Sequence, residues 1–162
     1  MEKQNGQDVF ELATTKDKLT ISASSVPSAG QGINWYLKYY CHQMMALQSS
    51  NLKPIRSLPQ VNAPERHVSQ AEYRYAFNYC TFNYSMSFWR WKEWETALDW
   101  MALNGVTTSL AMVGMEQVWY NTLQRLECTQ KEIDDFIPGP SYTAWWLMGN
   151  CPHFIMTAGK NT

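Results

Sequence analysis

Residues 73–114 read YRYAFNYCTFNYSMSFWRWKEWETALDWMALNGVTTSLAMVG and decide the fold of the chain. Tyr73–Phe82 is rich in aromatic and other strand-favouring residues, and Val106–Val113 is a short, mostly apolar run, so both are predicted as strands. Between them, Phe88–Leu103 carries apolar side chains at helical spacing. Gly105 ends this helix, because glycine adopts the left-handed backbone conformation without a Cβ clash. Strand, helix and strand joined by short connections predict a right-handed βαβ unit with parallel strands, a building block of an α/β fold.

The amino-acid composition indicates which kinds of ligand the chain is suited to bind. The chain has 162 residues and a formal net charge of −1. A chain of that length can form one ordinary domain, or parts of two domains that do not each have a complete hydrophobic core. Its 8 tryptophans and 9 tyrosines are an excess of aromatic residues, which at low net charge favours a carbohydrate or an apolar partner. Since there is no basic stripe, nucleic acid is not an expected partner.

The sequence indicates no membrane segment, cofactor or metal. No apolar run approaches the roughly 20 residues of a transmembrane helix. The polar start MEKQNGQDVFEL lacks the hydrophobic region of a signal peptide. The four cysteines are scattered without a CxxC pair, so neither a disulfide framework nor a zinc knuckle is predicted. Cys41 with His42 and Cys151 with His153 each lack a matching second pair for a four-ligand site.

The first third of the chain predicts a small α/β layer. Val9–Leu12 and Lys18–Ser22 are short strand-like runs, and residues 15–17 form a turn between them. Residues 27–32 contain proline and glycine and predict a loop. Aromatic and apolar residues then recur every three to four positions, which predicts an amphipathic helix over Ile33–Leu47.

Residues 49–69 hold three prolines and few periodic apolar positions, so they predict a linker with one short extended pairing segment at most. We therefore place a domain boundary near His67. The resulting division has a small N-terminal α/β domain with its linker at 1–67, the start of a second domain at 68–150, and a divergent tail at 151–162.

Helices dominate the sequence after the βαβ unit. Met115–Leu126 predicts a helix, and Thr129 with Glu132 predicts a capping box at the start of another. Residues 138–140 break that helix, and Tyr142–Met148 predicts a further helical turn. The inward face of the first of these helices is expected to consist of Val118, Trp119, Thr122 and Leu123. Two βα units in succession are typical of the opening of a (β/α)8 barrel or of a doubly wound sheet.

Candidate binding residues follow the two predicted strands, because the site of a parallel barrel forms at the carboxyl ends of its strands. Asn78 offers a donor and an acceptor to sugar hydroxyls, and Cys80, two residues on, is predicted to point to the same side of the strand. The alternative for Cys80 is a small buried apolar side chain. Trp145 and Trp146 lie in a loop-to-helix segment after the second strand, where one of them is expected to face the site.

Glu116 follows the second strand and is a candidate catalytic carboxylate. Glu116 also begins a predicted helix, where the helix dipole favours a negative side chain. We prefer this structural role for Glu116 to a catalytic one. Glycoside hydrolysis needs two carboxylates roughly 5 to 9.5 Å apart, and no second one lies at a predicted strand end. Residues assigned to the solvated face of the first helix are Glu93, Glu95 and Asp99. Tryptophans assigned mainly to core packing around that helix are Trp89, Trp91, Trp94 and Trp100.

Longer motifs are more specific than these single residues. YRYAFNYCTFNYSMSFWRWKEWETALDWMALNGVTTSLAMVGMEQVWYNTL at 73–123, followed by GPSYTAWWLMGN at 139–150, closely resembles the α-N-acetylglucosaminidases of glycoside hydrolase family 89. The earlier DVFEL, KLTIS and GINWYLKYYC segments resemble that family's small N-terminal α/β domain. The resemblance implies an α/β fold in which this small domain precedes the first two βα units of a (β/α)8 barrel, truncated after them.

The resemblance also implies an activity and a site. The family hydrolyses terminal α-linked N-acetylglucosamine with retention, so the implied partner is a glycan that ends in this sugar. Its sugar-pocket positions fall here on Asn78 and Cys80, with polar contacts to ring hydroxyls, and on Trp145 and Met148, which shape the pocket wall.

The family's two catalytic glutamates lie on later barrel strands, so no catalytic residue is expected in this chain and the chain alone is predicted to be inactive. CPHFIMTAGKNT at 151–162 replaces a glycine- and tryptophan-rich continuation, which predicts a truncated or frame-shifted product. The family is exported or lysosomal. The alternative function is a non-catalytic carbohydrate-binding or scaffold fragment.

Overall fold

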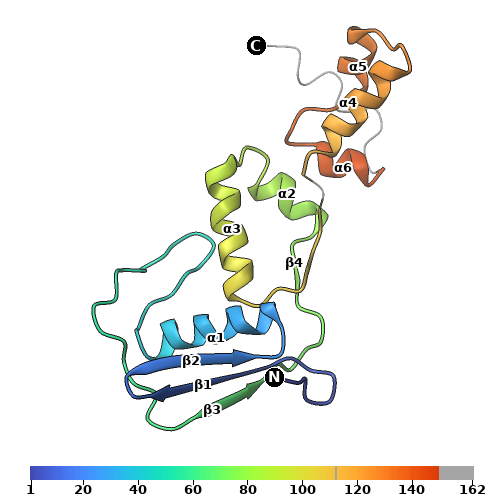
Figure 1. Ribbon diagram of the computed structural model, residues 1–162. Helices are drawn as coiled ribbons and strands as arrows, with labels where there is room; N and C mark the ends of the chain where they lie inside the picture. Colours follow the sequence, from blue (N-terminus) through green and yellow to red (C-terminus); the bar gives the residue numbers. More distant parts are fainter. Residues whose placement is uncertain (112, 150–162) are drawn as a thin grey trace. The chain divides into compact units, whose positions relative to one another are not determined.

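The computed structural model describes residues 1–111 and 113–149, and these form an α/β structure (Figure 1). The chain divides into two compact units. The first contains Met1–Ala76 and Trp91–Ser109, and the second contains Phe77–Arg90 and Leu110–Thr162. The tail predicted to diverge at 151–162, with Cys151 and His153, lies outside the described residues.

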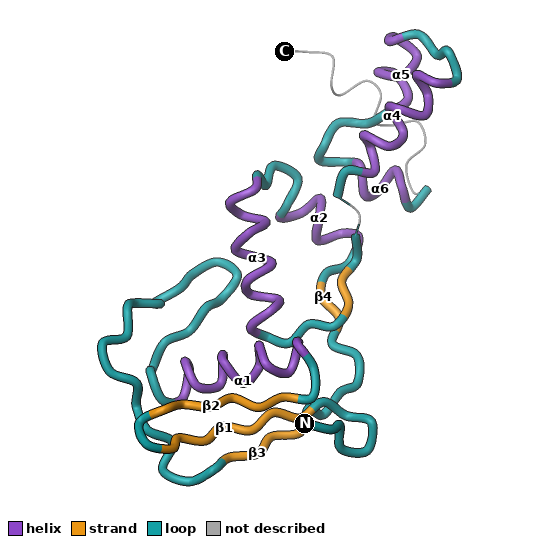
Figure 2. Tube along the Cα trace, viewed as in Figure 1, coloured by secondary structure: helices purple, strands orange, loops and turns teal. Residues whose placement is uncertain are grey.

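A three-stranded antiparallel sheet forms the base of the first unit. Its order is β2-β1-β3, with β1 at Val9–Thr15, β2 at Lys18–Ala23 and β3 at Glu65–Val68 (Figure 2). Lys16 and Asp17 form the two-residue turn between β1 and β2, and both have positive φ, at 49° and 61°. That conformation matches the twist of a hairpin. The predicted hairpin is confirmed, and β3 is the extended pairing segment expected within 49–69.

Helix α1, Val26–Tyr39, covers one face of this sheet (Figure 1). It begins earlier than predicted, because Ser25 is its N-cap in a capping box with Ser28, and a proline is tolerated in the first turn of a helix. The loop predicted at 27–32 is therefore wrong. The helix also ends at Tyr39 and not at Leu47.

The core of the first unit lies between α1 and the sheet. Its buried members are Phe10, Leu12, Tyr36 and Val61. Glycine brings α1 close to the sheet, since a Cβ added to Gly32 would lie 2.6 Å from Cγ2 of Ile21. The helix therefore packs with little space between its backbone and the strands.

The predicted βαβ unit is present with much shorter strands. β4, Tyr75–Ala76, pairs in parallel with β5, Thr108–Ser109, which confirms the predicted direction of the two strands. The chain between them forms α2, Tyr79–Ser85, and α3, Trp91–Leu103. The strand predicted up to Phe82 is wrong beyond Ala76, because Asn78 caps α2 and a local cap competes with the strand preference of aromatic residues.

Helices α1 and α3 pack closely within the first unit. A Cβ added to Gly30 would lie 2.0 Å from the carbonyl oxygen of Ala102 in α3. Gly105 has a φ of +65° just after α3, which confirms the predicted helix end. Ala97 is the buried residue of α3, whereas Trp91 is 69% exposed, so the core assignment is wrong for that tryptophan.

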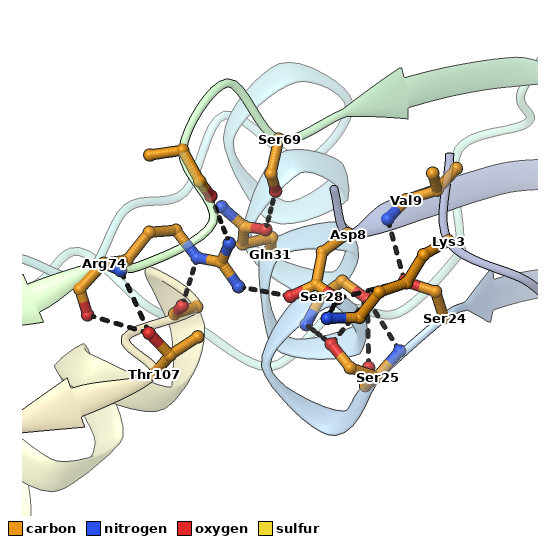
Figure 3. Close-up of polar contacts among 12 residues, drawn as sticks. Lys3, Asp8, Val9, Ser24, Ser25, Ser28, Gln31, Ser69, Arg74 and Thr107 are labelled. Atoms are coloured by element: carbon orange, nitrogen blue, oxygen red, sulfur yellow. Dashed lines mark hydrogen bonds and ion pairs between the residues drawn. The ribbon is translucent and has the colours of Figure 1, made fainter. Parts of the chain in front are cut away.

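A buried ion pair joins the sheet to the segment that leads into β4 (Figure 3). Arg74 Nη2 lies 2.6 Å from Oδ2 of Asp8, and Arg74 also donates to the carbonyls of Ala71 and Gly105. Ser24 donates its hydroxyl to the other oxygen of Asp8 at 3.2 Å. Burial alone raises the pKa of Asp8, but the hydrogen bonds from Arg74 and the serines, with the Arg74 charge, outweigh it and lower that pKa overall.

The second unit is helical in its later part, with α4 at Met115–Arg125, α5 at Gln130–Phe136 and α6 at Thr143–Leu147. The capping box of Thr129 and Glu132 is confirmed at the start of α5. The inward face predicted for α4 is wrong at Val118, which is 57% exposed, and at Thr122, which is also exposed. Trp119 does pack against Phe136 of α5 and Trp146 of α6, although α4 has no fully buried residue.

Candidate functional site

The predicted sugar-binding residues lie on two short helices of the second unit that pack against each other. Asn78 and Cys80 belong to the start of α2, and Trp145 and Met148 belong to α6 and its end. The two segments are about 65 residues apart in sequence, and the contact between the helices brings them into one region of the unit.

Asn78 is the N-cap of α2. Its Oδ1 accepts from the backbone N–H of Thr81 at 3.0 Å and from the hydroxyl of Thr81 at 2.8 Å. The side chain is exposed, and its Nδ2 group makes no hydrogen bond to the described residues. The amide therefore keeps two N–H donors for a ligand while its oxygen holds the helix start.

Cys80 lies in the first turn of α2 and is a half-buried free thiol. The prediction that Cys80 and Asn78 share one side of a strand is wrong, because this segment is helical. Residues two apart on a helix do not face the same way. Asn78 and Cys80 both lie at the start of α2, so a sugar that contacts both side chains must lie beside the first turn of this helix.

Trp145 and Trp146 have different surroundings. The Trp145 ring packs edge-on against Tyr84 of α2, with centroids 5.5 Å apart and an interplanar angle of 77°. Trp146 packs against Trp119 at 5.6 Å and Phe136 at 5.3 Å, in a cluster of rings from α4, α5 and α6. Trp146 is thus used for packing between helices, and Trp145 is the one of the pair on the side of α2.

Met148 is the C-cap of α6 and is half-buried. Its backbone N–H donates to the carbonyl of Ala144 at 3.0 Å, which holds it against the last turn of the helix. A flexible thioether in such a place fills an irregular apolar wall.

Asn83 holds the two helices together and was not found from the sequence. Its Nδ2 donates to the carbonyl of Pro140 at 2.7 Å, and its Oδ1 accepts from the backbone N–H of Ala144 in the first turn of α6. The first amides of a helix lack partners within the helix, so Asn83 acts as a cap for α6 supplied by α2. No local motif signals a pair 61 residues apart.

We expect Asn83→Ala to loosen α6. The variant removes the cap and the contact with the turn at Pro140, which together stabilise α6 by about 1–2 kcal/mol. Amide hydrogen exchange over residues 143–148 should accelerate about tenfold. Asn121→Ala is the matched control, because among the described residues the side chain of Asn121 makes one hydrogen bond, which it accepts from Gln117 on the exposed face of α4. Equal exchange rates in the two variants would show that Asn83 does not position α6.

Two carboxylates of the second unit serve helix starts. Glu116 lies in the first turn of α4, where the helix dipole favours a negative side chain. Glu132 belongs to the capping box of α5. Across residues 1–111 and 113–149, no cluster of three or more His, Cys, Asp or Glu side chains is placed to hold a metal ion. Over the same ranges, every helix is too short or too polar to cross a membrane.

Two family models match the chain in order. The model described as the alpha-N-acetylglucosaminidase N-terminal domain matches residues 1–60, and the one described as the TIM-barrel domain of the same enzyme matches residues 74–161. The second match spans more than half of the chain and includes all four predicted sugar-binding residues.

The chain is similar to an α-N-acetylglucosaminidase and to solved structures of a family 89 glycoside hydrolase. Human alpha-N-acetylglucosaminidase is 38% identical over 133 residues, which are 82% of this chain and 18% of the human protein. A family 89 glycoside hydrolase from Clostridium perfringens, in complex with 2-acetamido-1,2-dideoxynojirimycin, is 39% identical with a TM-score of 0.81. That match covers 91% of this chain and 17% of the bacterial one.

A variant of the C. perfringens protein with two Glu-to-Gln substitutions, in complex with its substrate GlcNAc-α-1,4-galactose, is 36% identical with a TM-score of 0.81. That match covers 96% of this chain and 19% of the other. The chain therefore spans about a fifth of the length of the relatives that it matches.

Proposed function

The chain belongs to the α-N-acetylglucosaminidase family, glycoside hydrolase family 89, and from this we propose that it is the N-terminal part of a retaining α-N-acetylglucosaminidase. The complete enzyme removes terminal α-linked N-acetylglucosamine from glycans and acts in the lysosome or after export. The ordered match of the two family models supports this proposal most strongly.

The two regions of the chain have different tasks in this proposal. Residues 1–67 form the small N-terminal α/β domain, whose sheet runs one residue further to Val68, and residues 68–150 begin the catalytic (β/α)8 barrel. The parallel pairing of β4 with β5 supports the second assignment, because neighbouring barrel strands are parallel. The names of the family models support both.

Four residues form part of the sugar pocket in this proposal. The free Nδ2 donors of Asn78 bind a ring hydroxyl, and the Cys80 thiol lies beside them at the start of α2. Trp145 offers an aromatic surface to the apolar face of the pyranose, and Met148 closes the wall at the end of α6. Asn83 positions this wall through its two contacts with the segment that begins α6.

We expect the 162-residue chain to show no turnover of a chromogenic α-N-acetylglucosaminide. Retaining hydrolysis needs two carboxyl groups about 5–5.5 Å apart, one as acid and one as nucleophile. In the second unit, Glu116 and Glu132 serve helix starts, and neither belongs to such an arrangement in this proposal. Release of the chromophore above a blank that contains heat-inactivated chain would overturn the assignment of the carboxylates.

Binding of the sugar is expected even without turnover. Titration with 2-acetamido-1,2-dideoxynojirimycin, the ligand of the C. perfringens relative, should change the tryptophan fluorescence in a saturable way. The affinity should be weak, because tight binding requires enclosure of most of the ligand surface. Trp145→Ala should abolish the change, and Trp91→Ala should keep it, since Trp91 is an exposed ring of the first unit. A titration that is the same in both variants would argue against a pocket at α6.

A further inference from the structure

The first unit contains a groove that shares no lining residue with the proposed sugar pocket. Its volume is about 610 Å³, and it is lined by α1, by the chain that follows β3 and by the end of α3. Helix α1 contributes Gln31, Asn34, Trp35 and Lys38. Their spacing of three, four and seven residues places them on one face of the helix. Trp35 also packs against the core of the first unit, and none of the four is fully buried.

Aromatic rings form one wall of the groove. The Trp35 ring lies 4.0 Å from the ring of His67 and 4.2 Å from that of Tyr39, measured between centroids, and His67 stacks on Phe10 at 4.9 Å. Glu65 fixes this wall, because its carboxylate accepts from Nε1 of Trp35 and contacts Nε2 of His67, each at 3.2 Å. The rings are therefore held in place before any ligand binds.

The groove also presents amide groups with unused hydrogen-bonding capacity. The Nδ2 group of Asn34 makes only a long contact of 3.5 Å with Asn104, and its Oδ1 has no partner among the described residues. The Oε1 of Gln31 accepts from the hydroxyl of Ser69 at 2.8 Å, which leaves the Nε2 group of Gln31 as a donor. These amides offer both donors and acceptors to one ligand.

Two of the three charged side chains in or near the groove are paired within the protein. Arg74 lies in the lining but is paired with the carboxylate of Asp8 at 2.6 Å. The ammonium group of Lys38 lies over the ring of Tyr39, 5.2 Å from its centroid. The carboxylate of Glu65 is held behind the aromatic wall by Tyr40, Trp35 and His67. Lys38 is exposed at the edge of α1 and is the charged group of the lining that an anionic ligand would use, so the test below includes a charged disaccharide.

We propose that this groove is a second carbohydrate-binding site, which takes a neutral saccharide of one or two pyranose units. The apolar faces of pyranose rings pack against aromatic walls, and their hydroxyl groups both donate and accept, as amide side chains do. The volume lies within the range of small-molecule sites. Such a site holds a glycan to the N-terminal region, separately from the residues that shape the proposed pocket.

The test is a titration of the ¹⁵N-labelled chain with GlcNAc-α-1,4-galactose, followed by NMR. The indole N–H resonance of Trp35 should shift in a saturable way. Asn34→Ala should weaken this binding about fivefold, as expected for the loss of one hydrogen bond, with an unchanged melting temperature because Asn34 has only one long contact to lose. Asn62→Ala is the control, because Asn62 is exposed and does not line the groove, and its titration should match the unaltered chain.

Three results would overturn the proposal: an unmoved Trp35 resonance up to the solubility limit of the sugar, the same midpoint in Asn34→Ala as in the control, or a shift only with a disaccharide that carries a glucuronate. The last result would indicate an anion site based on Lys38. The indole of Trp145 reports the proposed sugar pocket in the same spectra, so failure of one site is distinguishable from failure of the other.

Discussion

Arg74→Met is expected to lower the free energy of unfolding of the first unit by about 3–5 kcal/mol. The substitution keeps most of the side-chain volume but removes the close 2.6 Å ion pair of Asp8, which is only 3% exposed. The remaining cation of Asp8 is Lys3, which is half exposed and lies 3.6 Å from the carboxylate. The substitution also leaves the carbonyls of Ala71 and Gly105 without their guanidinium donor. Urea unfolding followed by circular dichroism measures the loss.

Arg66→Met is the control for this prediction. Arg66 pairs with Glu11 at 3.5 Å, but both side chains are well exposed, at 45% and 36%. Exposed ion pairs contribute about 0–1 kcal/mol, so this variant should stay close to the unaltered chain. If Arg74→Met lowered the free energy of unfolding no more than Arg66→Met does, the ion pair with Asp8 would not be a main contact between the sheet and the segment that leads into β4.

The Asp8 pair also predicts a dependence on pH. The pKa of Asp8 in the folded chain lies below its ordinary value of 3.8, because the hydrogen bonds and the charge of Arg74 outweigh the effect of burial. A group with a lowered folded pKa contributes stability above its unfolded pKa and loses that contribution as the pH falls through the folded value. The difference between the unaltered chain and Arg74→Met should therefore shrink below about pH 3.8. If the stability difference between the two proteins stayed constant below pH 3.8, the Asp8 carboxylate would not be its source.

Gly30→Ala is the second change with a large expected effect. The added Cβ would lie 2.0 Å from the carbonyl oxygen of Ala102, a backbone atom that cannot turn away as a side chain can. Helices α1 and α3 must separate, and overpacking of this kind costs about 1–3 kcal/mol or more. The melting temperature of the variant measures the effect.

Gly139→Ala makes the same chemical change where there is room. Apart from its two chain neighbours, no atom of the described residues lies within 4 Å of a Cβ added at Gly139, so this variant is expected to leave the melting temperature nearly unchanged. A Gly30→Ala variant as stable as Gly139→Ala would show that α1 and α3 do not pack as closely as described.

Local signals in the sequence identified the parts of the fold that depend on neighbouring residues. The turn at Lys16 and Asp17 and the capping box of Thr129 and Glu132 both form within a few residues, and both are confirmed. Helix α2 was missed because its aromatic residues favour strands in general, whereas the single cap at Asn78 decides the local structure. The start of α1 is hard to predict, because a proline can either break a helix or occupy its first turn, as Pro27 does.

Contacts between distant segments were less predictable. The close approach of Gly30 to Ala102 and the ion pair of Asp8 with Arg74 join residues more than 60 positions apart, and neither has a local pattern. The same holds for Asn83 and α6. Met148 came from the family resemblance alone, whereas Asn78, Cys80 and Trp145 were also candidates from their positions after the predicted strands. The assignment of all four stays a prediction. What the structure adds is that α2 and α6, which carry them, pack against each other.

The indole N–H resonances of the tryptophans in the ¹⁵N-labelled chain test most directly whether α2 and α6 form part of an N-acetylglucosamine pocket. The chain is titrated with 2-acetamido-1,2-dideoxynojirimycin and, separately, with 1-deoxynojirimycin, which lacks the acetamido group. We expect a saturable shift of the Trp145 resonance with the first compound and a much weaker response to the second. An unmoved Trp145 resonance, or equal responses to the two compounds, would contradict the claim that α2 and α6 form part of an N-acetylglucosamine pocket.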